Sequence, residues 1–138
     1  MRSSLRNVAA VIAGFVAASI VMMIVEFLNG HVLYPELGKA AEGVTDRETM
    51  RALMAAAPVG AFLVVIAGWI LGGLAGGWTA ARLAARAAAR HGLALGALLT
   101  LAGVANNLML PPPLWFWVAS LAVLMPAAYA GARLAPAR

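Results

Sequence analysis

The stretch that decides the fold is residues 58–81, PVGAFLVVIAGWILGGLAGGWTAA, which contains no charged residue. A bilayer core about 30 Å thick needs about 20 apolar residues in a helix, because each residue rises about 1.5 Å. Three further uncharged stretches run from Val8 to Val25, from Gly92 to Leu110 and from Leu114 to Ala132. Within lipid these segments must be helices, since an open strand would leave backbone groups unpaired.

The composition also favours a membrane protein. Of the 138 residues, 64% are hydrophobic and 11% are charged, whereas soluble chains have roughly 45–50% and roughly 25%. We therefore expect an all-α integral membrane four-helix bundle that forms a single transmembrane domain over residues 1–138. The expected helices cover about residues 8–28, 58–82, 92–110 and 114–133.

The distribution of basic residues predicts the orientation. With four spans, both termini and the connection between the second and third helices share one side of the membrane. That side holds seven basic residues, and the opposite side holds three (Arg2, Arg6, Arg82, Arg86, Arg90, Arg133 and Arg138 against Lys39, Arg47 and Arg51). The positive-inside rule then places the N- and C-termini in the cytoplasm.

The connection between the first and second spans is long enough to have structure of its own. Thr45-Asp46-Arg47-Glu48 matches a capping box, in which the Thr45 oxygen and the Glu48 side chain satisfy backbone donors at a helix start. Apolar residues follow at helical spacing, which predicts a short amphipathic helix at about residues 46–57 on the outer face. This helix is either a lid or docking element, or a segment that only leads the chain back into the membrane.

Glu26 is the only acidic residue attached directly to an apolar span. Carboxylates within the membrane are costly and are candidates for function. We expect Glu26, Asn29 and His31 to lie near Asn106 and Asn107, at the matching end of the third span. Such a site would bind a cation, pass a proton or hold a polar head group. The alternative is structural: Glu26 reaches headgroup water, and the asparagines hydrogen-bond between helices.

Glycines recur on the second span every four residues and mark the third span as well. They are Gly68, Gly72 and Gly76, with Gly73 and Gly77 one step round, and Gly96. Small residues at this spacing let backbones approach closely, and in lipid this packing holds helices together. The second span is therefore predicted to be the centre of the bundle or the face that meets another subunit, with a pore lining as the alternative.

Arg82, Arg86 and Arg90 are spaced by four residues after the second span. This spacing predicts one basic stripe on the emerging helix. The stripe would bind anionic lipid headgroups or an acidic partner, or it would serve only as a topological stop signal.

Two pairs of segments in the chain are similar to each other. Residues 78–84, WTAARLA, match residues 129–135, YAGARLA, at an offset of 51, and residues 30–35, GHVLYP, match residues 106–111, NNLMLP. This pattern predicts two helical hairpins of the same orientation, related as a parallel repeat. The alternative is that alanine-rich helix ends followed by arginine arose independently.

We find no set of residues in the sequence that could form a catalytic site. It has no cysteine and two histidines, and it lacks a glycine-rich phosphate loop, a paired-histidine metal motif and a serine elbow. We expect no enzyme activity, no cofactor and no metal site. Nucleic-acid binding is not expected either, because the basic residues lie at membrane boundaries rather than on one soluble face.

Residues 25–35, VEFLNGHVLYP, and 105–117, ANNLMLPPPLWFW, resemble a group of uncharacterised small bacterial integral membrane proteins with four predicted spans. The similarity in layout covers most of the chain. The resemblance implies a four-span protein of the bacterial inner, or cytoplasmic, membrane and implies no particular activity.

These observations predict a non-enzymatic small integral membrane protein that acts through helix–helix packing. It would be a homo-oligomer or an accessory subunit of a membrane complex, so its partners would be the lipid bilayer and copies of itself or other membrane subunits. The alternative is a small oligomeric channel or transporter with a polar site at Glu26, Asn106 and Asn107.

Overall fold

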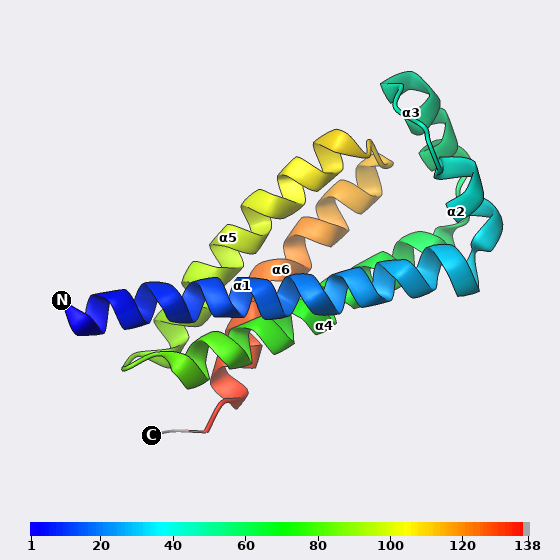
Figure 1. Ribbon diagram of the computed structural model, residues 1–138. Coiled ribbons are helices and arrows are strands. Elements are labelled where there is room, and N and C mark those ends of the chain that lie inside the picture. The colour runs from blue at the N-terminus through cyan, green and yellow to red at the C-terminus, as the bar shows by residue number, and fades with distance from the viewer. Residues whose placement is uncertain (137–138) are drawn as a thin grey trace.

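A computed structural model describes residues 1–136, and the expected all-α fold is confirmed (Figure 1). The elements are α1 (Arg2–Leu28), the π-helical turn η1 (Asn29–Leu33), α2 (Pro35–Ala41), α3 (Arg47–Ala56), α4 (Val59–Leu83), α5 (Ala88–Met109) and α6 (Leu114–Leu134). Four helices are long and apolar enough to cross a membrane: α1 continued by η1, then α4, α5 and α6. The chain is therefore a multi-pass membrane protein. Arg138, which was counted with the basic side, lies outside the described residues.

The central helix of the bundle is α4, which packs against α1, α5 and α6. In Figure 1, α1 and α4 run alongside each other, whereas α5 and α6 diverge from α1 toward the end of the bundle that carries α2 and α3. We call this the α2–α3 end. The core that joins the spans is formed by small and aliphatic residues, among them Ala18, Leu95 and Leu124.

The glycines of α4 face two different neighbours. Gly68, Gly72 and Gly76 pack on α1, and a Cβ atom added at Gly76 would lie 2.6 Å from the Gly14 carbonyl oxygen. Gly73 and Gly77 pack on α6, where a Cβ atom at Gly77 would overlap the Ala128 backbone. Gly96 of α5 lies against Met125 of α6. The absence of side chains at these positions lets α4 approach two helices at once.

The hairpins α1–α4 and α5–α6 meet along α4 and α6. These two helices run in the same direction, and Gly77 of α4 packs against the backbone of Ala128 of α6. Gly77 and Ala128 differ by 51 residues, which is the offset of the sequence repeat. Their contact is what a parallel pair of hairpins would produce, and common origin by duplication stays a prediction.

Two helices begin earlier than expected, and one was not expected. α1 begins at Arg2 rather than near residue 8, α5 begins at Ala88 rather than near residue 92, and α2 had no predicted counterpart. The predicted bounds followed the apolar stretch, but a helix continues past it where its polar end has partners. The Arg6 Nε atom donates a hydrogen bond of 2.9 Å to the Leu83 carbonyl, which ties this end of α1 to α4.

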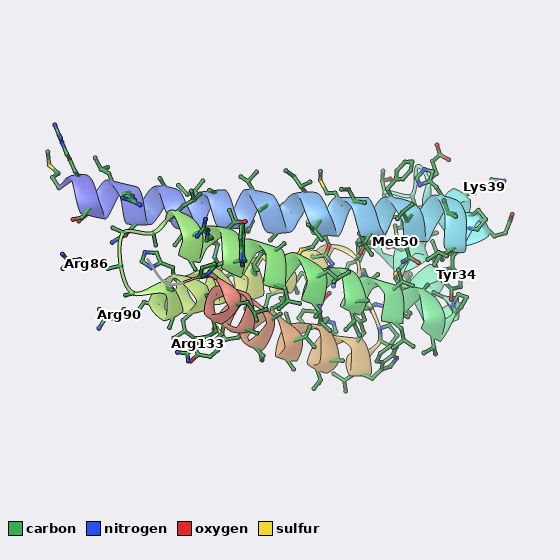
Figure 2. The ribbon with its side chains drawn as sticks, turned by 90° about the horizontal axis from the view of Figure 1, so that it is seen from below. Tyr34, Lys39, Met50, Arg86, Arg90 and Arg133 are labelled. Carbon is green, nitrogen blue, oxygen red and sulfur yellow. The ribbon has the colours of Figure 1, made fainter. Side chains whose placement is uncertain are left out.

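The prediction of one basic stripe was wrong. Arg82 lies on α4 over the Trp78 ring, Arg86 lies in the connection after Leu83, and Arg90 lies on α5. The chain turns at Ala87, whose φ of 58° is left-handed. A run of alanines carries no glycine or proline signal for such a turn. Arg86, Arg90 and Arg133 still share the end of the bundle opposite the α2–α3 end (Figure 2).

The predicted capping box was also wrong by one residue. α3 begins at Arg47, and Asp46 is its N-cap: the Thr49 backbone N–H and the Thr49 hydroxyl donate hydrogen bonds of 2.7 and 2.6 Å to Asp46 Oδ2. The Asp46 carboxylate thus takes the place expected for the Thr45 hydroxyl. The helix itself covers residues 47–56, close to the expected 46–57.

Candidate functional site

A cavity of about 580 Å³ lies between α1, α4, α5 and α6 near the α2–α3 end. Along α1 and into η1 it extends from Phe15 to Asn29, which is about four helical turns. Its walls are mostly apolar and include Phe62 and Trp69 of α4 and Leu99 of α5. Its volume lies within the range of roughly 300–1,000 Å³ that is typical of small-molecule sites.

The cavity has a buried floor and an exposed rim. Trp69, Leu99, Gly103, Phe116 and Leu124 of the floor are all buried. The exposed lining residues are Met23 and Glu26 on α1, Ala102 on α5 and Leu110 directly after α5. The cavity therefore opens between α1 and α5, which are both long and apolar enough to cross a membrane.

Helices α2 and α3 cover the cavity at the α2–α3 end. Met50 of α3 contributes to the lining and is only 8% exposed, although α3 itself lies outside the spans. The Arg47 Nη1 atom donates a hydrogen bond of 2.6 Å to the carbonyl of Leu108 on α5, so α3 is joined directly to the rim helix. Figure 2 shows Met50 at the same end as Tyr34 and Lys39. The amphipathic helix predicted from the sequence is thus the cover of a cavity.

Three of the predicted site residues line this cavity: Glu26, Asn29 and Asn106. Glu26 of α1 and Asn29, the first residue of η1, are about one turn apart and lie on the side of Ser19, another lining residue. Asn29 is 7% exposed, and its Nδ2 atom donates a hydrogen bond of 3.0 Å to the Ala61 carbonyl. Its buried Oδ1 atom has no hydrogen-bond partner among the described residues. Asn29 therefore brings an unpaired, buried acceptor to the polar end of the cavity.

The backbone beside these groups is a π-helical turn. Its signature is the hydrogen bond of 2.8 Å from the Tyr34 N–H to the Asn29 carbonyl, five residues back. Single π turns within α-helices are frequent at functional sites. This turn places Asn29 beneath α2, where Gly38 packs directly on the backbone of Gly30.

The structure does not bring His31 and Asn107 to the cavity. His31 is exposed, stacks on Phe27 with ring centroids 4.2 Å apart, and its Nδ1 atom lies 3.0 Å from the Phe27 carbonyl oxygen. Asn107 is fully buried on the other face of α5, where its Nδ2 atom donates a hydrogen bond of 3.1 Å to the Ser120 hydroxyl. The adjacent asparagines therefore separate: Asn106 faces the cavity, and Asn107 joins α5 to α6.

The chemistry available in the cavity is that of hydrogen bonding and charge pairing. Within residues 1–136 no group of three histidine, cysteine, aspartate or glutamate side chains is placed to hold a metal ion. Sequence reasoning missed Ser19, Trp69 and the methionines of the lining, because an apolar residue in a span carries no signal that it faces a cavity rather than lipid.

The chain matches no protein-family model, no curated protein and no solved structure. The similarity to small bacterial four-span membrane proteins therefore stays a prediction. The ligand class has to be inferred from the lining itself: one carboxylate, two amides and one hydroxyl in an otherwise apolar space.

Proposed function

We propose that this protein binds an amphiphilic molecule of the bilayer in the cavity beneath α2 and α3, and that it acts by holding or presenting that molecule rather than by catalysis. The apolar part of the ligand would lie along the floor, toward Trp69 and Leu124. Its polar head would lie at the α2–α3 end, beside Glu26, Asn29 and Asn106.

The single observation that carries this proposal is the shape of the cavity: its buried floor is apolar, its polar end lies beside α2 and α3, and its exposed rim, which includes Glu26, is on the side of α1 and α5. A cavity for a water-soluble solute would be expected to open toward an aqueous face. Here the exposed rim residues lie on the flanks of α1 and α5, and the α2–α3 end is covered by Met50 and Met54. A membrane lipid or a similar amphiphile reaches such an opening by lateral diffusion.

The two functions expected from the sequence differ in how well they fit this proposal. A channel or transporter has less support, because the polar lining ends at Ser19 and the adjoining core residues Ala18, Leu95 and Leu124 are apolar and buried. Self-assembly, or membership of a larger complex in the cytoplasmic membrane of a bacterium, stays a prediction. A ligand-presenting protein fits either arrangement.

The test is native mass spectrometry of the full chain released gently from its membrane. We expect a 1:1 adduct of one lipid-like species on the 14.2 kDa chain. The adduct should be lost in Ala102→Phe, where the new ring occupies the rim of the cavity. The same spectrum reports copies of the chain or other subunits, so it also tests the expected self-assembly.

The matched control is Ala97→Phe, which makes the same change on the same helix. Ala97 is exposed and is not part of the cavity lining, and it lies about 140° around α5 from Ala102. We expect Ala97→Phe to keep the adduct. Equal adducts in both variants, or no adduct in the wild-type protein, would overturn the proposal.

A further inference from the structure

We infer that the cavity selects amphiphiles with a primary amine head over those with a hydroxyl or carboxylate head. This inference rests on the proposed function, because it names the chemical class of the ligand for the same site. It follows from an inventory of the hydrogen-bonding groups that the cavity leaves unused.

The unused groups of the lining are mainly acceptors. Glu26 offers two carboxylate oxygens. The Asn29 Oδ1 atom is a buried acceptor without a partner, and the Asn29 Nδ2 atom is already bonded to the Ala61 carbonyl. The Ser19 hydroxyl donates its hydrogen to the Phe15 carbonyl at 2.8 Å, so only its oxygen remains to accept. Asn106 is the one lining side chain whose amide has both donor and acceptor capacity to offer.

The cavity lining carries negative charge and no positive charge. Among the described residues that line the cavity, Glu26 is the only charged one, and none is lysine, arginine or histidine. The basic residues of the covering helices are not part of the lining: Arg47 donates to the Leu108 carbonyl, Lys39 lies 4.0 Å from Glu36 with a side chain that is 75% exposed, and Arg51 is exposed. An anionic head would meet a carboxylate without a compensating cation.

A primary ammonium group matches this inventory, because it has three donors and no acceptor. Glu26 presents acceptors from α1 and Asn106 presents one from α5, and the unpaired Oδ1 atom of Asn29 belongs to the first residue of η1, three residues after Glu26. A hydroxyl head supplies one donor and leaves the carboxylate charge uncompensated. A carboxylate within the membrane is costly when it has no partner, and an amine head supplies that partner.

The experiment compares three probes of equal chain length in wild-type protein held in lipid nanodiscs: hexadecylamine, hexadecanol and hexadecanoic acid, each brominated on the chain. Bromine quenches tryptophan fluorescence at contact, and Trp69 is the tryptophan of the cavity floor. The quenching that disappears in Trp69→Phe measures occupancy of the cavity.

We expect the amine to bind at least about tenfold more tightly than the alcohol, the factor expected for one charge-assisted hydrogen bond, and more tightly again than the acid. Glu26→Gln should lower amine binding to the level of the alcohol. Glu36→Gln, which removes an exposed carboxylate of α2 outside the cavity, is the matched control and should leave amine binding unchanged.

The outcomes separate this inference from the proposed function. If no probe produces quenching that depends on Trp69, the proposed function fails and this inference fails with it. If all three probes bind equally, the cavity binds amphiphiles without selecting the head, and only the inference is overturned. Tightest binding of the acid, lost in Arg47→Gln, would overturn it in favour of an anionic head. The comparison of the three probes in the wild-type protein tests the inference even if Glu26→Gln does not fold.

Discussion

The guanidinium of Arg47 and the carbonyl of Leu108 are joined by a hydrogen bond of 2.6 Å that links α3 to the end of α5. This bond joins a short helix outside the spans to one of the two helices that flank the opening of the cavity. The position of the cover and the position of the rim are therefore coupled through one side chain.

Replacing Arg47 should loosen α3 without unfolding the bundle. A hydrogen bond to a charged donor is worth about 1.5–3 kcal/mol when buried and less when exposed, so Arg47→Ala should speed hydrogen exchange of the α3 amides by up to about tenfold. Arg51→Ala is the control, because Arg51 is exposed on the same helix. Equal exchange rates in the two variants would show that the Arg47 bond does not hold the cover.

The order of α3 should depend on pH through Asp46. Hydrogen bonds from the Thr49 hydroxyl and the Thr49 backbone lower the pKa of Asp46 below its ordinary value of 3.8. Because the folded-state pKa is depressed, this stabilisation is fully present above about pH 4 and is lost as the pH falls through the depressed pKa. Amide exchange of α3 should therefore accelerate, relative to the intrinsic rate, only below this window.

The control for this pH dependence is Asp46→Ser, which retains a capping oxygen but does not titrate in the same range. We expect it to keep α3 helical and to remove the acid-induced loosening. Glu48→Gln changes an exposed carboxylate in the same turn and should leave the pH profile as in the wild-type protein. If the acid-induced loosening were lost in Glu48→Gln and kept in Asp46→Ser, Asp46 would not be the N-cap residue whose titration loosens α3.

A side chain at Gly77 should separate α4 from α6. A Cβ atom there would overlap the carbonyl oxygen of Ala128, and backbone cannot move aside as a flexible side chain does. Gly77→Ala should lower the free energy of unfolding by about 1–3 kcal/mol, the usual cost of overpacking. Ala67→Leu, on an exposed face of α4, should change it little. Denaturant titration in mixed micelles measures the free energy of unfolding of both variants. Equal stability of the two variants would contradict the close packing of α4 on α6 at Gly77.

The two adjacent asparagines should have separable effects. Asn107→Ala removes the buried hydrogen bond to Ser120 and should lower stability by about 0.6 kcal/mol, the average for such bonds between membrane helices, and by no more than about 1.7 kcal/mol. Asn106→Ala should instead weaken ligand binding and leave stability nearly unchanged, since Asn106 faces the cavity. Thermal unfolding measures the loss of stability, and Trp69 quenching measures the loss of ligand binding. If one of the two variants showed both losses, the separate roles of Asn106 and Asn107 would be contradicted.

The membrane-spanning helices were predictable because the length of each uncharged stretch of sequence determines where a span lies. α4 and α6 end within one residue of their predicted bounds, since the arginines at 82 and 133 mark where the apolar stretch stops. The turn at Ala87 and the π turn at Asn29 were not predictable, because neither has a local residue signal and both depend on the packing of neighbouring helices.

The site was predictable only in part. Glu26 stood out because a carboxylate at the end of a span is unusual, and the structure places it at the cavity with Asn29 and Asn106. The sequence offered no means of deciding between Asn106 and Asn107, since adjacent helical residues lie 100° apart and the orientation of α5 is set by α6. The apolar floor was not identified at all, because the cavity results from the divergence of α1 and α5.

The lateral position of the opening changes which concentration governs occupancy. A molecule that reaches the cavity from within the bilayer is counted by its mole fraction among the lipids, and its aqueous solubility has no part in the equilibrium. Its search is confined to two dimensions and ends at a gap between α1 and α5. A site of modest intrinsic strength is then filled by a minor lipid component, and occupancy would follow the composition of the leaflet around it.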